Sequence, residues 1–153
     1  DVNFENVRVP AANRLEGDFE AVIAASRVAL AALAIGVAKA SLDYAIDYAK
    51  ERDVFGVKVA QKQAIAFMMA EMAMEIEATR MLTWEAAWML DTEKEDAYKS
   101  AYLASISAID MVMMVTDRGV QILGGHGYIR EHPVERWMRN GRGFATFTGL
   151  AIV

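Results

Sequence analysis

The sequence contains no cysteine, only two prolines and only two histidines. The absence of cysteine excludes disulfides, thiolate catalysis and cysteine-based metal sites, and it is compatible with a reducing compartment. Di-metal centres in helical bundles use a histidine three residues after a glutamate, and neither His126 nor His132 follows a glutamate at that spacing. We therefore predict that the chain has no metal site.

Charge, apolar runs and motifs exclude three further classes. The net charge is −5 and no run of basic residues occurs, so nothing favours nucleic-acid binding. The longest apolar stretch, residues 19–38, is interrupted by Glu20, Ser26 and Arg27, and we predict no membrane span. No Gly-x-Ser-x-Gly motif is present, which leaves nucleophilic serine catalysis without support.

What the sequence does contain is typical of helices. It is 55% hydrophobic over 153 residues and includes ten methionines, which predicts an all-α fold, an up-down four-helix bundle. The expected helices cover residues 19–50, 60–90, 97–123 and 134–139, with a tail at 143–153 that starts a final helix. We interpret most methionines and the Trp84/Trp88 pair as core residues, and Gly36 as a point of close helix approach.

The first sixteen residues follow a different pattern. Residues 1–10 roughly alternate between apolar and polar side chains, which predicts a half-buried strand that ends at Pro10. A lone strand is not stable, so it should belong to a sheet outside the chain. Because the first residue is Asp1 rather than methionine, we expect the chain to be part of a longer protein, with a boundary between residues 1–16 and 17–153.

Two segments carry candidate chemistry. In the loop at 51–56, Arg52 offers a planar fork suited to phosphate, and Phe55 is a loop aromatic beside a glycine. A simple helix C-cap with Gly56 past its end explains that loop equally well. In residues 120–139, adjacent glycines follow a helix end and permit positive φ and close approach of a ligand, and Pro133 restarts a helix.

Four motifs in one order and spacing give a family resemblance. They are Arg-x-x-Phe-Gly at 52–56, Gln-Ala-Ile at 63–65, Gln-Ile-Leu-Gly-Gly-x-Gly-Tyr at 121–128 and Pro-Val-Glu-Arg-x-Met-Arg at 133–139. Together they resemble the acyl-CoA dehydrogenase family over essentially the whole chain. By this resemblance, residues 1–16 are the end of the middle β-domain and its linker, and residues 17–153 are the C-terminal four-helix domain.

The resemblance implies an FAD-dependent oxidoreductase of fatty acid metabolism that dehydrogenates the α and β carbons of acyl-CoA thioesters. It implies a homo-oligomer (dimer or tetramer) or a hetero-oligomer with a related subunit, in a bacterial cytoplasm or the mitochondrial matrix. FAD would lie between the bundle and a neighbouring subunit. The implied FAD contacts are Arg52, Phe55, Gln63, Gln121, Gly124 and Gly125, and the implied acyl-CoA contacts are Arg27 and Gly149.

The catalytic base is where this sequence departs from the family. The usual glutamate is replaced by Thr148, and the alternative position on the first helix is Ser26, with Ala24 where an aspartate is often found. Neither hydroxyl is a general base without an activating group.

Three explanations follow for the missing base. It comes from elsewhere, with Asp18, Glu20 and Glu131 as candidates, or the C-terminal end is divergent. Alternatively, the chain is a base-less, non-catalytic subunit that completes a partner's FAD site, or a relative with different flavin chemistry. A bundle unrelated to flavin is a further alternative. On its own, the chain is expected to be inactive and to bind FAD weakly or not at all.

Overall fold

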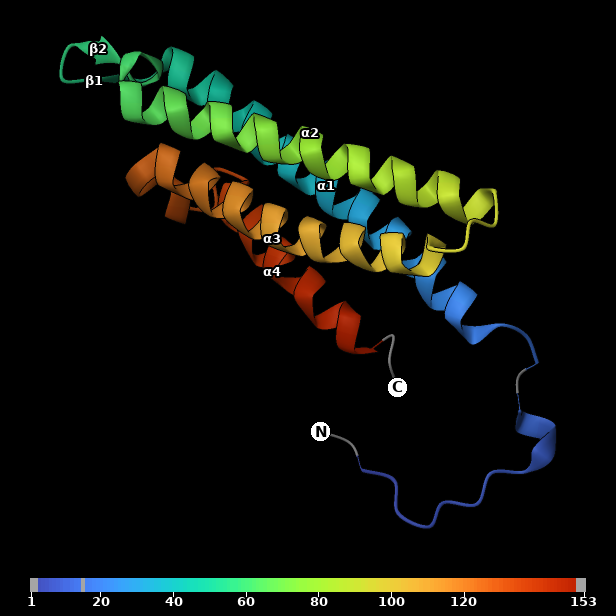
Figure 1. Cartoon of the computed structure of the whole chain (residues 1–153). Coiled ribbons are helices and arrows are strands. Elements are labelled where there is room, and N and C mark those ends of the chain that lie inside the picture. The colour runs from blue at the N-terminus through green and yellow to red at the C-terminus, as the bar shows by residue number, and fades with distance from the viewer. Residues whose placement is uncertain (1–2, 15, 151–153) are drawn as a thin grey trace.

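The computed structural model describes residues 3–14 and 16–150, apart from the side chains of 147–150. Its main elements are four helices, with consecutive helices joined at alternate ends of the bundle (Figure 1). The helices are α1 (Phe19–Glu51), α2 (Gln63–Asp91), α3 (Ala97–Leu123) and α4 (Val134–Leu150). The connections contain β1 (Asp53–Val54), β2 (Val57–Lys58), and the 3-10 helices η2 (Val59–Gln61) and η3 (Gly124–Tyr128). The predicted all-α, up-down four-helix bundle is confirmed.

Helix α1 contacts α2, α3 and α4, as α3 contacts the other three helices. It begins where the Asp18 side chain accepts a hydrogen bond from the Ala21 amide at 3.1 Å, a standard N-cap arrangement. Small alanine side chains line its buried face and let the other helices approach closely. Larger side chains from the other helices, including Met72, Ile76 and Val112, fill the remaining core.

Among the described residues, α1 is also the one helix long and apolar enough to cross a bilayer by length and composition. Core helices of bundles meet the same criterion, so it is weak evidence for a span. The buried face of α1 packs against three other helices of the same chain. Within this chain, 28% of the most apolar window of α1 is buried.

The N-terminal segment differs from the prediction. Of residues 3–14, none forms a strand; Ala11–Asn13 form a 3-10 helix and the side chains are exposed. Figure 1 shows this segment running away from the bundle. A strand needs a neighbour to pair with, and none of the described residues supplies one to this segment. Its pairing with a sheet outside the chain, and the boundary at residue 16, stay predictions.

At the other end, the expected short helix and separate tail form one helix, α4, which begins directly after Pro133 as predicted. Arg139 binds Glu135 one turn earlier, with 2.8 Å between Nε and Oε2. Gly141 does not break the helix, because it is buried where a Cβ atom would lie 3.0 Å from Thr116 Oγ1. Packing on α3 therefore overrides the low helix propensity of glycine.

Two packing predictions are wrong for this chain. A Cβ atom at Gly36 would meet nothing within 4 Å, whereas one at Gly119 would overlap Ser41 Oγ; the close approach of α1 and α3 is at Gly119. Trp84 and Trp88 are 62% and 56% exposed and pack in no core. The methionine prediction holds better, since most methionines of the described residues are buried or half-buried.

Candidate functional site

The candidate site lies at the end of the bundle where α1 and α3 both finish. The hairpin that follows α1 and the 3-10 helix that follows α3 border a groove of about 390 Å³. The groove is lined by Tyr48, Arg52, Val54, Val59, Lys62, Ile65, Ile122, Leu123, Gly124, Gly125 and His126. Two segments far apart in the sequence, both singled out as candidates for phosphate or close ligand approach, thus share one surface.

The loop after α1 is a two-residue hairpin. Strands β1 and β2 pair antiparallel, with Val54 opposite Val57, and Phe55 and Gly56 both have positive φ, 56° and 80°. Positive φ at both central residues is the tight turn that matches the twist of paired strands. Gly56 therefore serves the hairpin, and the alternative that it follows a helix C-cap is wrong, since Arg52 caps α1.

Two cations lie at the hairpin side of the groove. Arg52 is exposed, and among the described residues nothing gives its guanidinium a hydrogen bond or an ion pair. Lys62 Nζ lies over the Phe55 ring, 5.5 Å from its centroid. An unpaired guanidinium with a second cation nearby provides the fork and charge that suit a diphosphate.

The opposite wall of the groove is glycine backbone. Gly124 ends α3 with φ 58° and ψ −129°, a conformation that side-chain-bearing residues rarely adopt. A Cβ atom at Gly124 or Gly125 would meet nothing within 4 Å, so both glycines leave open space beside the groove. Gly127 is the residue that packs closely, against the Val120 carbonyl.

The other implied FAD contacts do not line the groove. Phe55 is at the tip of the hairpin and is 95% exposed. Gln63 is the exposed first residue of α2, directly after Lys62, and Gln121 is exposed near the end of α3. The structure therefore brings together Arg52, Gly124 and Gly125, and leaves the remaining three on surrounding surface.

The implied acyl-CoA arginine lies at the other end of α1. Arg27 precedes Arg52 by 25 residues, about 38 Å at 1.5 Å per residue. Its guanidinium lies 5.0 Å from the centroid of the Tyr102 ring, which gives this half-buried cation a favourable partner. Arg27 of α1 thus packs against an aromatic face on α3.

Ser26 and Asp18, two candidates for the missing base, are not activated as bases. Ser26 Oγ donates to the Val22 carbonyl at 2.8 Å, within its own helix. Asp18 accepts from the Tyr98 hydroxyl at 2.7 Å and from the Ala21 amide, and these bonds lower the pKa of Asp18, which makes it a weaker base. Helix α4 continues through Thr148 and Gly149, but their side chains lie outside the described residues.

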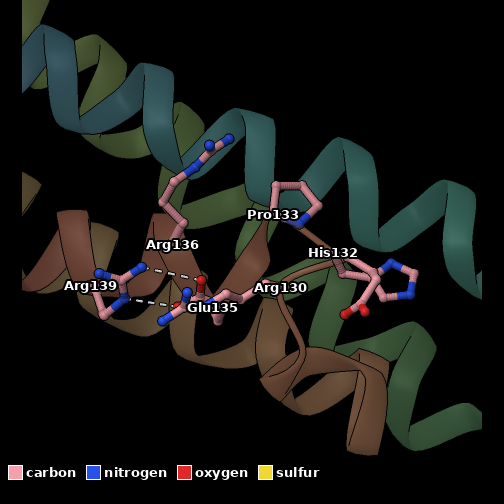
Figure 2. Close-up of a pocket in the computed structure, with 7 residues that line it drawn as sticks. Arg130, His132, Pro133, Glu135, Arg136 and Arg139 are labelled. Carbon is pink, nitrogen blue, oxygen red and sulfur yellow. Dashed lines mark hydrogen bonds and ion pairs between the residues drawn. The ribbon is translucent and has the colours of Figure 1, made fainter.

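Glu131, another candidate for the base, lies near the opposite end of α1 from Asp18 and Glu20. It is part of the lining of a basic pocket (Figure 2). The pocket is lined by Arg130, Glu131, His132, Pro133, Glu135, Arg136 and Arg139. Figure 2 shows Glu135 paired with Arg139; the hydrogen bond lowers the pKa of Glu135. The described residues hold no group of three or more metal-ligating side chains.

Four residues that sequence reasoning missed lie next to the groove. Tyr48 shares a 2.9 Å hydrogen bond with His126, and Tyr44 shares one of 2.7 Å with His132. The available signals were the spacing of the tyrosines, one turn apart on a helix, and the placement of both histidines in the segment after the glycine pair.

Comparison with known proteins gives consistent matches. Residues 19–151 match the family model described as acyl-CoA dehydrogenase, C-terminal domain. The caffeyl-CoA reductase-Etf complex subunit CarC of Acetobacterium woodii is 42% identical over 100% of this chain and 42% of that protein. The mitochondrial short-chain specific acyl-CoA dehydrogenase of Sus scrofa is 38% identical over 91% of this chain and 35% of that protein.

Solved structures agree. Butyryl-CoA dehydrogenase from Megasphaera elsdenii superposes with a TM-score of 0.83 and 35% identity over 97% of this chain and 41% of that one. The chain spans about two fifths of the length of the relatives it matches.

Proposed function

The chain belongs to the acyl-CoA dehydrogenase family, and we propose that its groove holds the diphosphate and adenosine part of FAD in a larger flavoprotein. One observation carries this proposal: Arg52, Gly124 and Gly125 line the same groove, although they follow different helices. The family resemblance independently implies each of them as a flavin contact. Their convergence is what a shared ligand requires.

The chemistry of the groove suits that part of the cofactor. Arg52 and Lys62 supply positive charge for a diphosphate. The two glycines let backbone approach a ligand closely, and apolar side chains such as Val54 and Ile122 offer a surface for an adenine ring. When bound, FAD supplies a two-electron acceptor, and this chain holds and orients it.

On this basis the whole protein is an FAD-dependent oxidoreductase acting on acyl-CoA thioesters, in a bacterial cytoplasm or the mitochondrial matrix. It works as an oligomer, in which the exposed Phe55 at the hairpin tip contacts the flavin of a neighbouring subunit, beside Gln63. Gln121 approaches the adenosine end from α3. The 95% exposure of Phe55 within this chain leaves most of its ring available for contact with a partner.

The test is FAD affinity of the full-length protein. Arg52→Ala should weaken FAD binding about 10- to 100-fold, the range expected for loss of a charged hydrogen bond, without lowering the melting temperature of the apoprotein. Arg52→Lys keeps the positive charge but loses the planar guanidinium, so its FAD affinity should lie between those of the wild type and Arg52→Ala. Lys99→Ala is the matched control, an exposed cation on the far end of α3. Unchanged affinity in Arg52→Ala would refute the proposal.

A second function rests on the base positions. Ser26 is bonded within its own helix and a threonine occupies position 148, so dehydrogenation lacks an evident proton acceptor. A relative at 42% identity is named as a reductase subunit in a complex with Etf. These observations favour a base-less member that completes a partner's FAD site or runs different flavin chemistry, in a mixed oligomer.

Anaerobic flavin absorbance separates the two functions. A dehydrogenase bleaches on addition of acyl-CoAs of several chain lengths, and Thr148→Val leaves that bleaching unchanged if the base is elsewhere. A base-less protein keeps its oxidised flavin spectrum with every acyl-CoA, and gains bleaching in Thr148→Glu. Bleaching in the wild type that is lost in Thr148→Val would instead assign a direct role to the threonine hydroxyl.

A further inference from the structure

The chain's two histidines are both hydrogen-bonded to tyrosines of α1. Tyr44 and Tyr48 lie one turn apart on α1, while His126 and His132 lie in the segment that joins α3 to α4. The hydroxyl of Tyr48 is 2.9 Å from Nδ1 of His126, and that of Tyr44 is 2.7 Å from Nδ1 of His132. We call these four residues the histidine–tyrosine clip.

Ring packing joins the two hydrogen-bonded pairs into one unit. The imidazoles of His126 and His132 are stacked, with centroids 5.3 Å apart and planes inclined by 13°. The ring of Tyr48 meets both imidazoles edge-on at 5.8 Å. Because edge-to-face and offset contacts add to the hydrogen bonds, the clip fastens both ends of the 124–133 segment to α1.

The clip adjoins the groove directly. Tyr48 and His126 both line the groove, and the Tyr48 hydroxyl is also 3.5 Å from the carbonyl oxygen of Leu123, the last residue of α3. The intervening Gly124 and Gly125 have no Cβ, so their backbone is free to adopt many conformations unless something outside them restricts it. Restriction before binding reduces the entropy that a ligand must otherwise remove.

We propose that the histidine–tyrosine clip positions Gly124 and Gly125 to receive FAD. The four residues are positioning residues that act through the glycine backbone; Tyr48 and His126 also line the groove, whereas the other two do not. The inference rests on the proposed function, since it assumes that the groove binds FAD. It predicts that a hydroxyl and an imidazole at the groove edge control FAD affinity more than they control folding.

The experiment measures FAD affinity of the full-length apoprotein by titration, with the melting temperature recorded for each variant. Tyr48→Phe keeps the ring and removes the hydroxyl, and His126→Leu removes the imidazole. Each should weaken FAD binding about three- to tenfold, the range for one neutral hydrogen bond. The double variant should lose no more FAD affinity than the weaker-binding single variant, because both substitutions break the same hydrogen bond.

Two further variants isolate positioning from stability. His126→Asn can keep a polar atom near the position of Nδ1 and should restore affinity to within about twofold of the wild type. Tyr98→Phe is the matched control, because it also removes a tyrosine hydroxyl hydrogen bond, 2.7 Å to Asp18, at the far end of the bundle. It should leave FAD affinity unchanged.

Each failure has a distinct reading. If Tyr48→Phe and His126→Leu bind FAD as the wild type does while Arg52→Ala binds weakly, the positioning role of the clip is refuted and FAD binding in the groove is supported. If Tyr98→Phe weakens FAD binding as much as Tyr48→Phe does, the effect is one of general stability and the clip is again refuted. If Arg52→Ala also binds normally, the proposed function itself fails.

Discussion

At the scale of single residues, two glycines inside helices have opposite surroundings. Gly119 of α3 faces Ser41 of α1 so closely that a Cβ atom would overlap the serine hydroxyl oxygen. Ser41 is fully buried, which leaves the hydroxyl little room to move aside. Gly36 of α1 has nothing within 4 Å of a Cβ position. Packing therefore requires a glycine at position 119, whereas at position 36 a glycine only adds conformational freedom to the unfolded chain.

Alanine at the two positions should therefore change stability in opposite directions. Gly119→Ala should destabilise the protein by about 1–3 kcal/mol through overpacking, and Gly36→Ala should stabilise it by about 0.5–1 kcal/mol through better helix propensity. Thermal or denaturant unfolding of the full-length protein measures both. Ser41→Gly should recover part of the loss in Gly119→Ala. A loss at Gly36→Ala would mean that another subunit packs against that glycine.

Single residues also show how far sequence reasoning reached. Arg52, Gly124 and Gly125 could be selected because their chemistry is local: a guanidinium fork and a backbone without Cβ keep their character in any fold. Tyr48 and His126 could not, since their pairing joins residues 78 positions apart. Gly36 and Gly119 look alike in sequence, and only the register of α1 on α3 distinguishes them.

At the scale of elements, helix α1 is held at its beginning by a group that titrates. The Asp18 carboxylate caps the helix and also accepts a hydrogen bond from Tyr98 of α3. That hydrogen bond, followed by the one from Ala21, holds the pKa of Asp18 below its ordinary value of 3.8. Since the folded state favours the ionised form, the stabilisation is present above 3.8 and is lost as the pH falls through the lower folded pKa.

The variant Asp18→Asn tests this contribution, because asparagine caps helices well but does not titrate. The wild type should melt at a higher temperature than Asp18→Asn at neutral pH, and the difference should shrink progressively as the pH falls below 3.8. In a Tyr98→Phe background, the difference in melting temperature that Asp18→Asn causes should be smaller, because the hydrogen bond that most lowers the pKa of Asp18 is absent. A difference that stays constant with pH would contradict the prediction.

The long helices were predictable and the hairpin was not, for a physical reason. Residues 19–50 and 97–123 are long, largely apolar and free of proline, and their predicted limits agree with the structure within one residue. Each hairpin strand has only two residues, too few to show alternation. Its turn also places Phe55, a residue that rarely adopts positive φ, at φ 56°. The N-terminal segment gave the converse result: its alternating pattern is clear, but no strand among the described residues pairs with it.

At the scale of the whole molecule, α2 exposes an apolar stripe. It consists of Phe67, Met74, Met81, Trp84 and Trp88, each at least half exposed. Four of these residues recur every seven positions, which places them along one face of the helix. Figure 1 shows α2 along an outer side of the bundle. A continuous stripe of this kind is typical of a surface covered by another protein surface, and the proposed oligomer makes another subunit the expected one.

A charge in the middle of the stripe should therefore weaken the oligomer. Trp84→Glu places a carboxylate where an apolar partner surface is expected. Loss of a central tryptophan commonly costs about 2 kcal/mol or more in binding free energy. The dissociation constant between subunits, measured by analytical ultracentrifugation, should therefore rise at least about 30-fold. Asn140→Glu adds the same charge at an exposed position of α4 and should leave the mass unchanged. If Phe55 contacts a neighbour's flavin, FAD should dissociate together with the subunits in Trp84→Glu. An unchanged mass would mean that some other part of the protein covers α2.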